Sequence, residues 1–239
     1  MVKSAMAAKR KDESLVRPDP WNMRRDRVLY IPADVPGRCL RHYLKATADR
    51  VSLTPFGELY LFKESIVLFQ AMGAPLAVLA LENLIAGGAR EILMLGFSGS
   101  LAPRFSTGDA IVVCRARSEE GTSAHYFPVR KVFHPSPEMK RSVERRLTSL
   151  GLPFREAALV STDAPYRETR SWLRKQTAKG IGLVDMETSA VFALAEFRGL
   201  ESAALMIVSD ELRPDSWKDG FFQGRLRERA EEYFFPFIK

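Results

Sequence analysis

Apolar and polar positions along this chain repeat with two periods, one typical of strands and one typical of helices. Short apolar runs bounded by glycine or charged residues indicate buried strands at 28–31, 58–62, 65–70, 91–95, 110–115, 154–160, 183–185 and 202–208. Segments with apolar residues every three or four positions indicate helices at 37–48, 75–86, 137–150, 167–179, 188–198 and 221–233. Because the two kinds of element alternate, we expect an α/β fold whose largely parallel or mixed sheet is covered on both faces.

Three segments at the expected carboxyl ends of strands combine small and polar residues. The first is Gly96-Phe97-Ser98-Gly99-Ser100, which we interpret as a turn whose glycines let a ligand approach the backbone. The other two are 161–166, which ends at Tyr166, and the pair Ser209-Asp210. Since ligands of open α/β sheets bind outside the carboxyl ends of the strands, we expect all three segments at one site.

Two carboxylates stand at opposite ends of one helix–strand unit. Glu187 enters the helix predicted at 188–198, and Asp210 follows the strand predicted at 202–208. Such residues can simply stabilise a helix N-terminus or cap a turn. In a crevice, one carboxylate can instead accept hydrogen bonds from vicinal sugar hydroxyls, and one whose pKa is raised by burial can hold a proton for a leaving group. These residues alone leave both interpretations open.

Composition is that of one globular domain. The chain has 239 residues, 46% of them hydrophobic, which suffices for one large core. The net charge is +7, but residues 1–50 contain twelve lysines and arginines against six acids, so most of that charge lies in an N-terminal segment. This distribution argues against nucleic-acid binding across the domain. We divide the chain into a basic arm at 1–27 and a single domain at 28–239.

Cysteine usage and the apolar runs indicate a cytoplasmic protein. Cys39 and Cys114 lack the spacing of metal ligands, and the N-terminus lacks the apolar stretch of a signal peptide. The most apolar stretch, 66–84, is interrupted by polar residues and does not have the pattern of a membrane span. We therefore expect free thiols, no metal site and no membrane contact.

Four segments, in this order, resemble those of the nucleoside phosphorylase family, which includes purine nucleoside phosphorylases, uridine phosphorylases and methylthioadenosine nucleosidases. They are AMGAPLAVLALENLIAGGA, GFSGSL, VDMETSAVFALAEFRGL and IVSD, and the likeness spans roughly residues 28–222. The resemblance implies a three-layer α/β/α fold around a central mixed sheet, assembled as a dimer or a hexamer.

The resemblance also implies a role for each matching residue. Asp210 would protonate N7 of a purine leaving group, Glu187 would bind the ribose hydroxyls, and Met186 would pack against the sugar. Uridine-specific members lack an acid at the position of Asp210, so a purine-type substrate is implied. The remaining residues would line the base or ribose wall: Ser98, Gly99 and Tyr166.

The expected phosphate site departs from the family pattern. Where phosphorylases have Pro-Gly-Asp followed by an arginine, this chain has Ala33 in place of the glycine and then Arg38. Arg50 matches the arginine that reaches a neighbouring subunit's site. The family's strand arginine and its phosphate-binding serine or threonine correspond to Met94 and Phe97. Two of the convergent donors that anion recognition needs are thus apolar here.

We predict an enzyme of the pentosyltransferase class that cleaves the N-glycosidic bond of a purine-type nucleoside. Inorganic phosphate, held by Arg38 and Arg50, would be the co-substrate, and the products would be free base and ribose 1-phosphate. No cofactor is expected, and the expected partners are the nucleoside, phosphate and further copies of the chain. The alternatives are a nucleosidase that uses water and a nucleoside-binding protein whose phosphate site has decayed.

Overall fold

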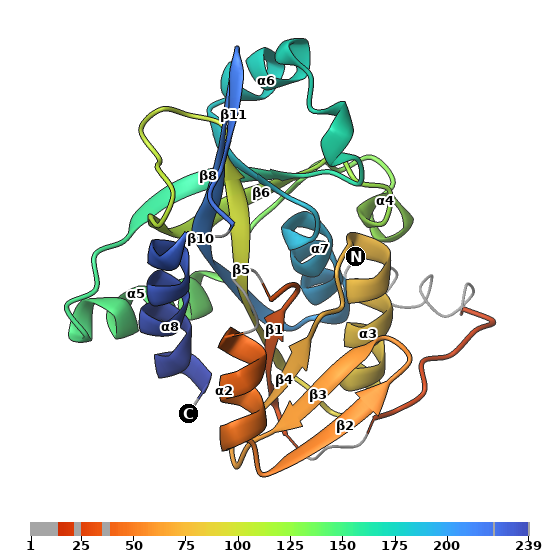
Figure 1. The fold of residues 1–239 in the computed structure, drawn as a ribbon. Coiled ribbons are helices and arrows are strands. Elements are labelled where there is room, and N and C mark those ends of the chain that lie inside the picture. Colours follow the sequence, from red (N-terminus) through yellow and green to blue (C-terminus); the bar gives the residue numbers. More distant parts are fainter. Residues whose placement is uncertain (1–13, 22–24, 35–38, 222, 239) are drawn as a thin grey trace.

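A computed structural model describes residues 14–21, 25–34, 39–221 and 223–238 of the chain. Within these residues, eleven strands form one mixed sheet, in the order β11-β10-β6-β8-β9-β5-β1-β4-β3-β2 with β7 added beside β6 (Figure 1). The strands are β1 (Arg27–Ile31), β2 (Arg50–Thr54), β3 (Gly57–Leu61), β4 (Ser65–Phe69), β5 (Glu91–Ser100), β6 (Ala110–Ser118), β7 (Val132–Phe133), β8 (Arg155–Ser161), β9 (Ile181–Asp185), β10 (Glu201–Arg213) and β11 (Ser216–Asp219).

Helices cover both faces of this sheet, as the alternating pattern predicts. They are α2 (Cys39–Thr47), α3 (Ala74–Ala86), α4 (Ser123–Tyr126), α5 (Pro137–Ser149), the 3-10 turn η2 (Pro165–Arg167), α6 (Arg170–Thr177), α7 (Thr188–Arg198) and α8 (Gly224–Ile238). Val28 and Tyr30 of β1 face the core beneath α3 and α7, whereas Leu29 and Ile31 face the core beneath α2, α5 and α8. This alternation along one strand confirms the three-layer α/β/α architecture (Figure 1).

The two longest strands, β5 and β10, lie in the middle of the fold and determine where the site lies. They pair in parallel from Glu91 and Glu201 upward, and β10 also pairs with β6, while the end of β5 pairs with β9. Through these pairings β5, β10, β6, β8 and β9 close into a ring at one end of the sheet. A bulge between Val208 and Asp210 shifts the register of β10, and such bulges redirect the side chains that follow them.

The segment 96–100 is strand, so the prediction of a turn there is wrong. Its backbone is held by β10 on one side and by β9 on the other, which extends β5 to Ser100. The glycines are needed for close packing, because a Cβ on Gly96 would lie 2.9 Å from the sulfur of Met206. The helix at Thr188–Arg198 is confirmed, and Gly199 ends it in the left-handed conformation at φ 72°.

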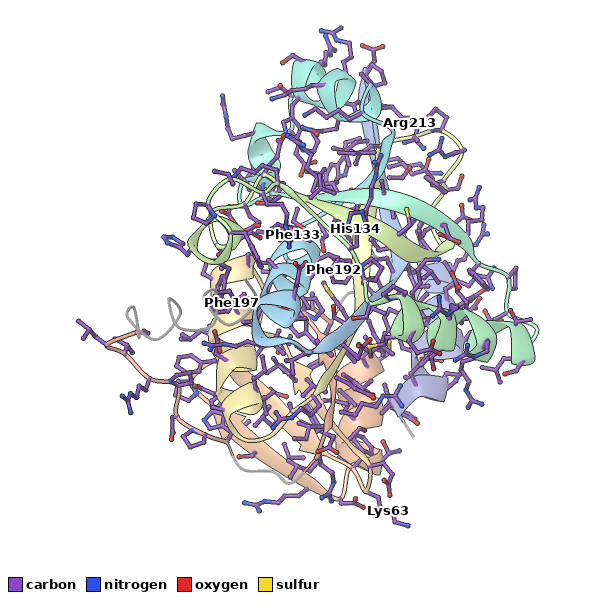
Figure 2. All side chains as sticks on the ribbon, turned by 180° about the vertical axis from the view of Figure 1, so that it is seen from behind. Lys63, Phe133, His134, Phe192, Phe197 and Arg213 are labelled. Carbon is purple, nitrogen blue, oxygen red and sulfur yellow. The ribbon has the colours of Figure 1, made fainter. Side chains whose placement is uncertain are left out.

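Several boundaries differ from the sequence prediction. Strands β2 and β11 were not predicted, since both are exposed and short of apolar residues. The C-terminal helix runs later than expected, over Gly224–Ile238. Figure 2 shows the molecule from behind, with Phe133 and Phe192 in the α7 layer and Arg213 near the β10–β11 end. Among the described residues, no helix combines the length and hydropathy that crossing a membrane requires.

Candidate active site

A cavity of about 500 Å³ opens at the carboxyl ends of β5, β9 and β10, where the α/β architecture places ligands. It brings together the predicted residues Ser98, Gly99, Met186, Glu187 and Asp210. Tyr166 also lines it, but its side chain is fully exposed, so it lies at the mouth. The other lining residues are Pro32, Ala33, Met72, Phe97, Pro165, Glu168, Val184, Asp185, Ser209, Leu212, Trp217 and Phe221.

Glu187 lies buried at the N-cap of α7, with 4% of its surface exposed. Its Oε1 accepts a hydrogen bond of 2.6 Å from the backbone N–H of Gly73, which precedes α3. Burial, and then the charge of Asp185, raise the pKa of the Glu187 carboxyl. The carboxyl is therefore oriented by one backbone donor and is poorly hydrated, so hydroxyl groups of a ligand would stabilise its ionised form.

Asp185, which the sequence analysis did not single out, supports that arrangement from behind. Its Oδ1 accepts from the hydroxyl of Ser161 at 2.6 Å, and its Oδ2 accepts from the backbone N–H of Thr188 at 2.9 Å. Burial raises the pKa of Asp185, and these hydrogen bonds oppose that rise. Since the bond to Thr188 satisfies a free N–H of the first helical turn, Asp185 fixes the start of α7 and with it the position of Glu187.

The prediction that Asp210 follows the end of its strand is wrong, because β10 continues to Arg213 and Asp210 lies within it, just after the bulge. Only 7% of its surface is exposed. Its Oδ1 accepts from the hydroxyl of Ser209 at 2.7 Å, and its Oδ2 accepts from the indole N–H of Trp217 at 2.8 Å. Burial raises the pKa of Asp210, while the bonds from Trp217 and Ser209 lower it. The result is a carboxyl held in one orientation, with a pKa above its ordinary value.

Glu168 is a fourth acid on the cavity wall, and the sequence alone did not identify it. It follows η2 in the loop before α6, and burial together with the charge of Asp210 raises its pKa to about 7. Two carboxyls that line one partly buried cavity and repel each other do not ionise together easily. It lies two residues beyond Tyr166, just outside the segment 161–166 that was expected at the site, and this proximity was its signal in the sequence.

Ser98 and Gly99 of β5 form the floor of the cavity beside Asp210. The hydroxyl of Ser98 is buried and has no hydrogen-bond partner among the described residues. A Cβ on Gly99 would lie 3.2 Å from Oδ2 of Asp210 and 3.0 Å from side-chain carbons of Val184 and Leu212. The floor therefore combines a free donor with a tight fit, which suits a flat polar ligand.

All the charged residues that line the cavity in the described part of the chain are acidic. The lining includes the acids Glu168, Asp185, Glu187 and Asp210, and no lysine or arginine among the residues that the structure describes. Arg38 lies outside the described residues. Arg50 begins β2 at the opposite edge of the sheet from β11 and does not line this cavity.

Met94 and Phe97 occupy the two positions where the family pattern has phosphate donors, and neither side chain can donate a hydrogen bond to an anion. Met94 is fully buried, and its sulfur lies 3.4 Å from the hydroxyl of Thr188. Phe97 lines the cavity and packs edge-on against Phe234 of α8, with ring centroids 5.6 Å apart. Across the described residues, no three histidines, cysteines or acids lie close enough together to hold a metal ion.

Comparison with known proteins shows which family the chain resembles. The sequence model of the family described as "Phosphorylase superfamily" matches residues 35–239. The chain is 28% identical to a guanosine phosphorylase of Halorubrum lacusprofundi over 161 residues, 67% of either chain. It is 26% identical to a DeoD-type purine nucleoside phosphorylase of Bacillus cereus over 145 residues, which span 59% of this chain and 61% of that one. The fold is similar to purine nucleoside phosphorylase from Toxoplasma gondii in complex with immucillin-H, with a TM-score of 0.77, 18% identity and 95% of both chains covered.

Proposed function

The chain belongs to the phosphorylase superfamily, and on that basis we propose that it cleaves the N-glycosidic bond of purine-type nucleosides with inorganic phosphate as the acceptor. One observation carries the proposal: Glu187 and Asp210, from two separate elements, line one cavity, and each is oriented by hydrogen bonds. The names of the guanosine and purine nucleoside phosphorylases to which the chain is similar support the same class of substrate.

Each residue would contribute to a different part of the reaction. Glu187 would accept hydrogen bonds from vicinal ribose hydroxyls, and Met186 would pack against the sugar. Asp210 would give its proton to N7 as the bond between C1′ and the base breaks, so that the purine leaves as a neutral molecule. Phosphate would attack C1′ from the opposite face, and Asp210 would regain a proton from water. Positioned acids of this kind contribute about 10²–10⁴-fold to the rate.

The base would lie between the β5 floor and the mouth of the cavity. Ser98 has a free buried hydroxyl to offer, Gly99 permits close approach, and Tyr166 would cover the outer side of the base. Glu168, with its pKa of about 7, would face a polar edge of the base as a neutral donor below that pH and as an acceptor above it.

Binding of phosphate would require cationic side chains other than the residues found to line the cavity. We propose Arg38 for this chain's own contribution, and Arg50 for a contribution to the cavity of a neighbouring subunit in a dimer or hexamer. Exposed apolar residues support such an assembly, since Leu53 on the edge strand β2 is 78% exposed and Met72 at the cavity is 58% exposed. The cysteines Cys39 and Cys114 are unpaired thiols, which supports a reducing compartment such as the cytoplasm.

Hydrolysis by water is the second candidate, and a specific observation favours it. The described lining carries four acids and no cation, and Met94 and Phe97 are apolar where anion donors were expected. A nucleosidase would not need those donors, because water is a neutral acceptor. In that case Asp210 and Glu187 would keep the same roles toward the base and the sugar.

The test is to incubate the protein with a panel of nucleosides, with and without phosphate, and to measure free base and pentose 1-phosphate. Base release that requires phosphate supports the proposal, and Arg38→Ala should then raise the phosphate KM more than the nucleoside KM. Release that does not depend on phosphate identifies a nucleosidase. Binding without release under either condition points to a nucleoside-binding protein and refutes both enzymatic readings.

A further inference from the structure

The hairpin formed by β10 and β11 extends beyond the other strands of the sheet (Figure 1). Leu212 pairs with Trp217 across the hairpin, and both line the cavity together with Asp210. On the other face of β10, Arg213 donates to the carbonyl oxygens of Ser100 and Phe105. The hairpin is therefore anchored behind the site while one of its faces forms a wall.

The tip of the hairpin is also attached to the loop and helix on the far side of the mouth. The guanidinium of Arg170, at the start of α6, donates to the carbonyl oxygen of Pro214 at 2.7 Å and lies 3.3 Å from the carboxylate of Asp215. Below, a Cβ on Gly220 would lie 2.3 Å from the carbonyl oxygen of Ser209, so the returning strand touches the backbone beside the acid. These contacts hold Trp217 over Asp210.

We propose that Trp217 is a positioning residue for the proton donor: its indole N–H orients the carboxyl of Asp210 and makes that carboxyl a stronger acid. The inference rests on the proposed function, because Asp210 has this role only if the purine is protonated on leaving. The ring of Trp217 lies 6.2 Å from that of Phe221 and is 59% exposed, so the indole lies at the mouth with its N–H directed inward.

The chemistry of the contact defines its effect. An indole N–H is only a donor, whereas the hydroxyl of Ser209 at the other oxygen can donate or accept. The bond from Trp217 therefore favours the ionised carboxylate and opposes the rise in pKa that burial produces. Each carboxyl oxygen has two lone pairs. One lone pair of Oδ2 can therefore bind a proton that is directed toward the ligand, while the other accepts the indole N–H and keeps the carboxyl in its orientation.

Other charges near Asp210 act on the same equilibrium and would remain in a variant of Trp217. The charge of Glu168 acts on Asp210 from the loop before α6, and the residues of β5 that line the cavity, Phe97, Ser98 and Gly99, are uncharged. Among the described residues, other charged groups lie on the hairpin itself and at the β9–α7 end of the cavity: Glu211, Arg213, Asp215, Lys218, Asp219, Asp185 and Glu187.

The test compares Trp217→Phe, which keeps an aromatic wall and removes the N–H, with Trp172→Phe as a matched control. Trp172 of α6 makes the same kind of bond, 2.8 Å to the carboxylate of Glu119, away from the cavity. Loss of the indole N–H in Trp217→Phe should raise the pKa of Asp210 by about one unit, because a hydrogen bond to a charged group contributes a free energy of about that equivalent. The alkaline limb of the plot of kcat/KM against pH should therefore move up by about one pH unit. The plateau of kcat should fall about tenfold, while KM changes less than about threefold.

A second measurement needs no turnover. NMR titration of labelled aspartate carboxyl carbons, with Asp210→Asn to assign the signal, should show the pKa of Asp210 higher in Trp217→Phe than in the unmodified protein and unchanged in Trp172→Phe. An unchanged pKa in Trp217→Phe, with the variant folded, overturns the proposal whatever the activity. Failure of the unmodified protein to release base from any nucleoside overturns the proposed function instead, so the two failures are distinct.

Discussion

Replacing Glu168 with glutamine should stabilise the folded protein at alkaline pH and have no effect at acid pH. The pKa of this carboxyl rises from 4.5 to about 7 through burial and the charge of Asp210. Below pH 4.5 the group is protonated in both the folded and the unfolded chain, so it contributes no difference. Between pH 4.5 and 7 only the folded chain retains the proton, and above pH 7 the folded chain must hold an ionised carboxylate in the cavity. Stability therefore falls as the pH rises through this window.

The magnitude follows from the same values. A rise of the pKa from 4.5 to about 7 corresponds to about 3 kcal/mol of unfolding free energy. Because Glu168 is only partly buried, solvent screens the interaction, and we expect about 1–2 kcal/mol. Glutamine has nearly the same shape and cannot ionise, so Glu168→Gln should be more stable than the unmodified chain by this amount at about pH 8 and equal to it at about pH 4.5.

Urea unfolding followed by tryptophan fluorescence, at several pH values and one protein concentration, measures this difference. The dependence of the free energy on urea should stay the same, so that a shift in midpoint reports stability alone. The acid arm of the series is the internal control. A stability difference that is constant with pH, or a variant that is less stable at alkaline pH, would show that the carboxyl is not destabilised by the cavity.

The remaining predictions concern the acid, the sugar contact and the hairpin. Asp210→Asn should lower kcat about 10²–10⁴-fold on purine nucleosides while nucleoside affinity, measured by calorimetry, changes little; unchanged turnover would remove Asp210 from the mechanism. Glu187→Gln should weaken nucleoside binding about tenfold or more, because hydrogen bonds from the sugar to a charged group are lost, and a 2′,3′-dideoxynucleoside should bind both forms equally if the assignment is right. Gly220→Ala should cost about 1–3 kcal/mol in thermal unfolding, because its Cβ would lie 2.3 Å from the carbonyl oxygen of Ser209; an unchanged melting temperature would mean that the hairpin moves without cost.

The alternation of apolar periods predicted most of the helices and the inner strands, because buried faces constrain local sequence directly. The helix Thr188–Arg198, with Gly199 at its end, could be located from the pattern alone. The edge strands β2 and β11 could not, since exposed strands lack the apolar run that identifies a buried one. The segment 96–100 was misread for a related reason: glycines mark both turns and close backbone packing, and only the neighbouring strands distinguish the two.

By itself, the sequence determined that the fold is α/β, that Glu187 stands at the start of a helix and that Asp210 follows the apolar run at 202–208, because these facts follow from short-range order along the chain. Only the tertiary structure placed Trp217 on one oxygen of Asp210, brought Glu168 into the same cavity and left the hydroxyl of Ser98 without a partner among the described residues. These contacts join residues from different elements, and their geometry depends on the pairing of β5 with β10 and on the bulge before Asp210. The local sequence pattern does not determine which distant strands pair. The pKa values and the orientations of the carboxyl groups in the cavity therefore follow only from the tertiary structure.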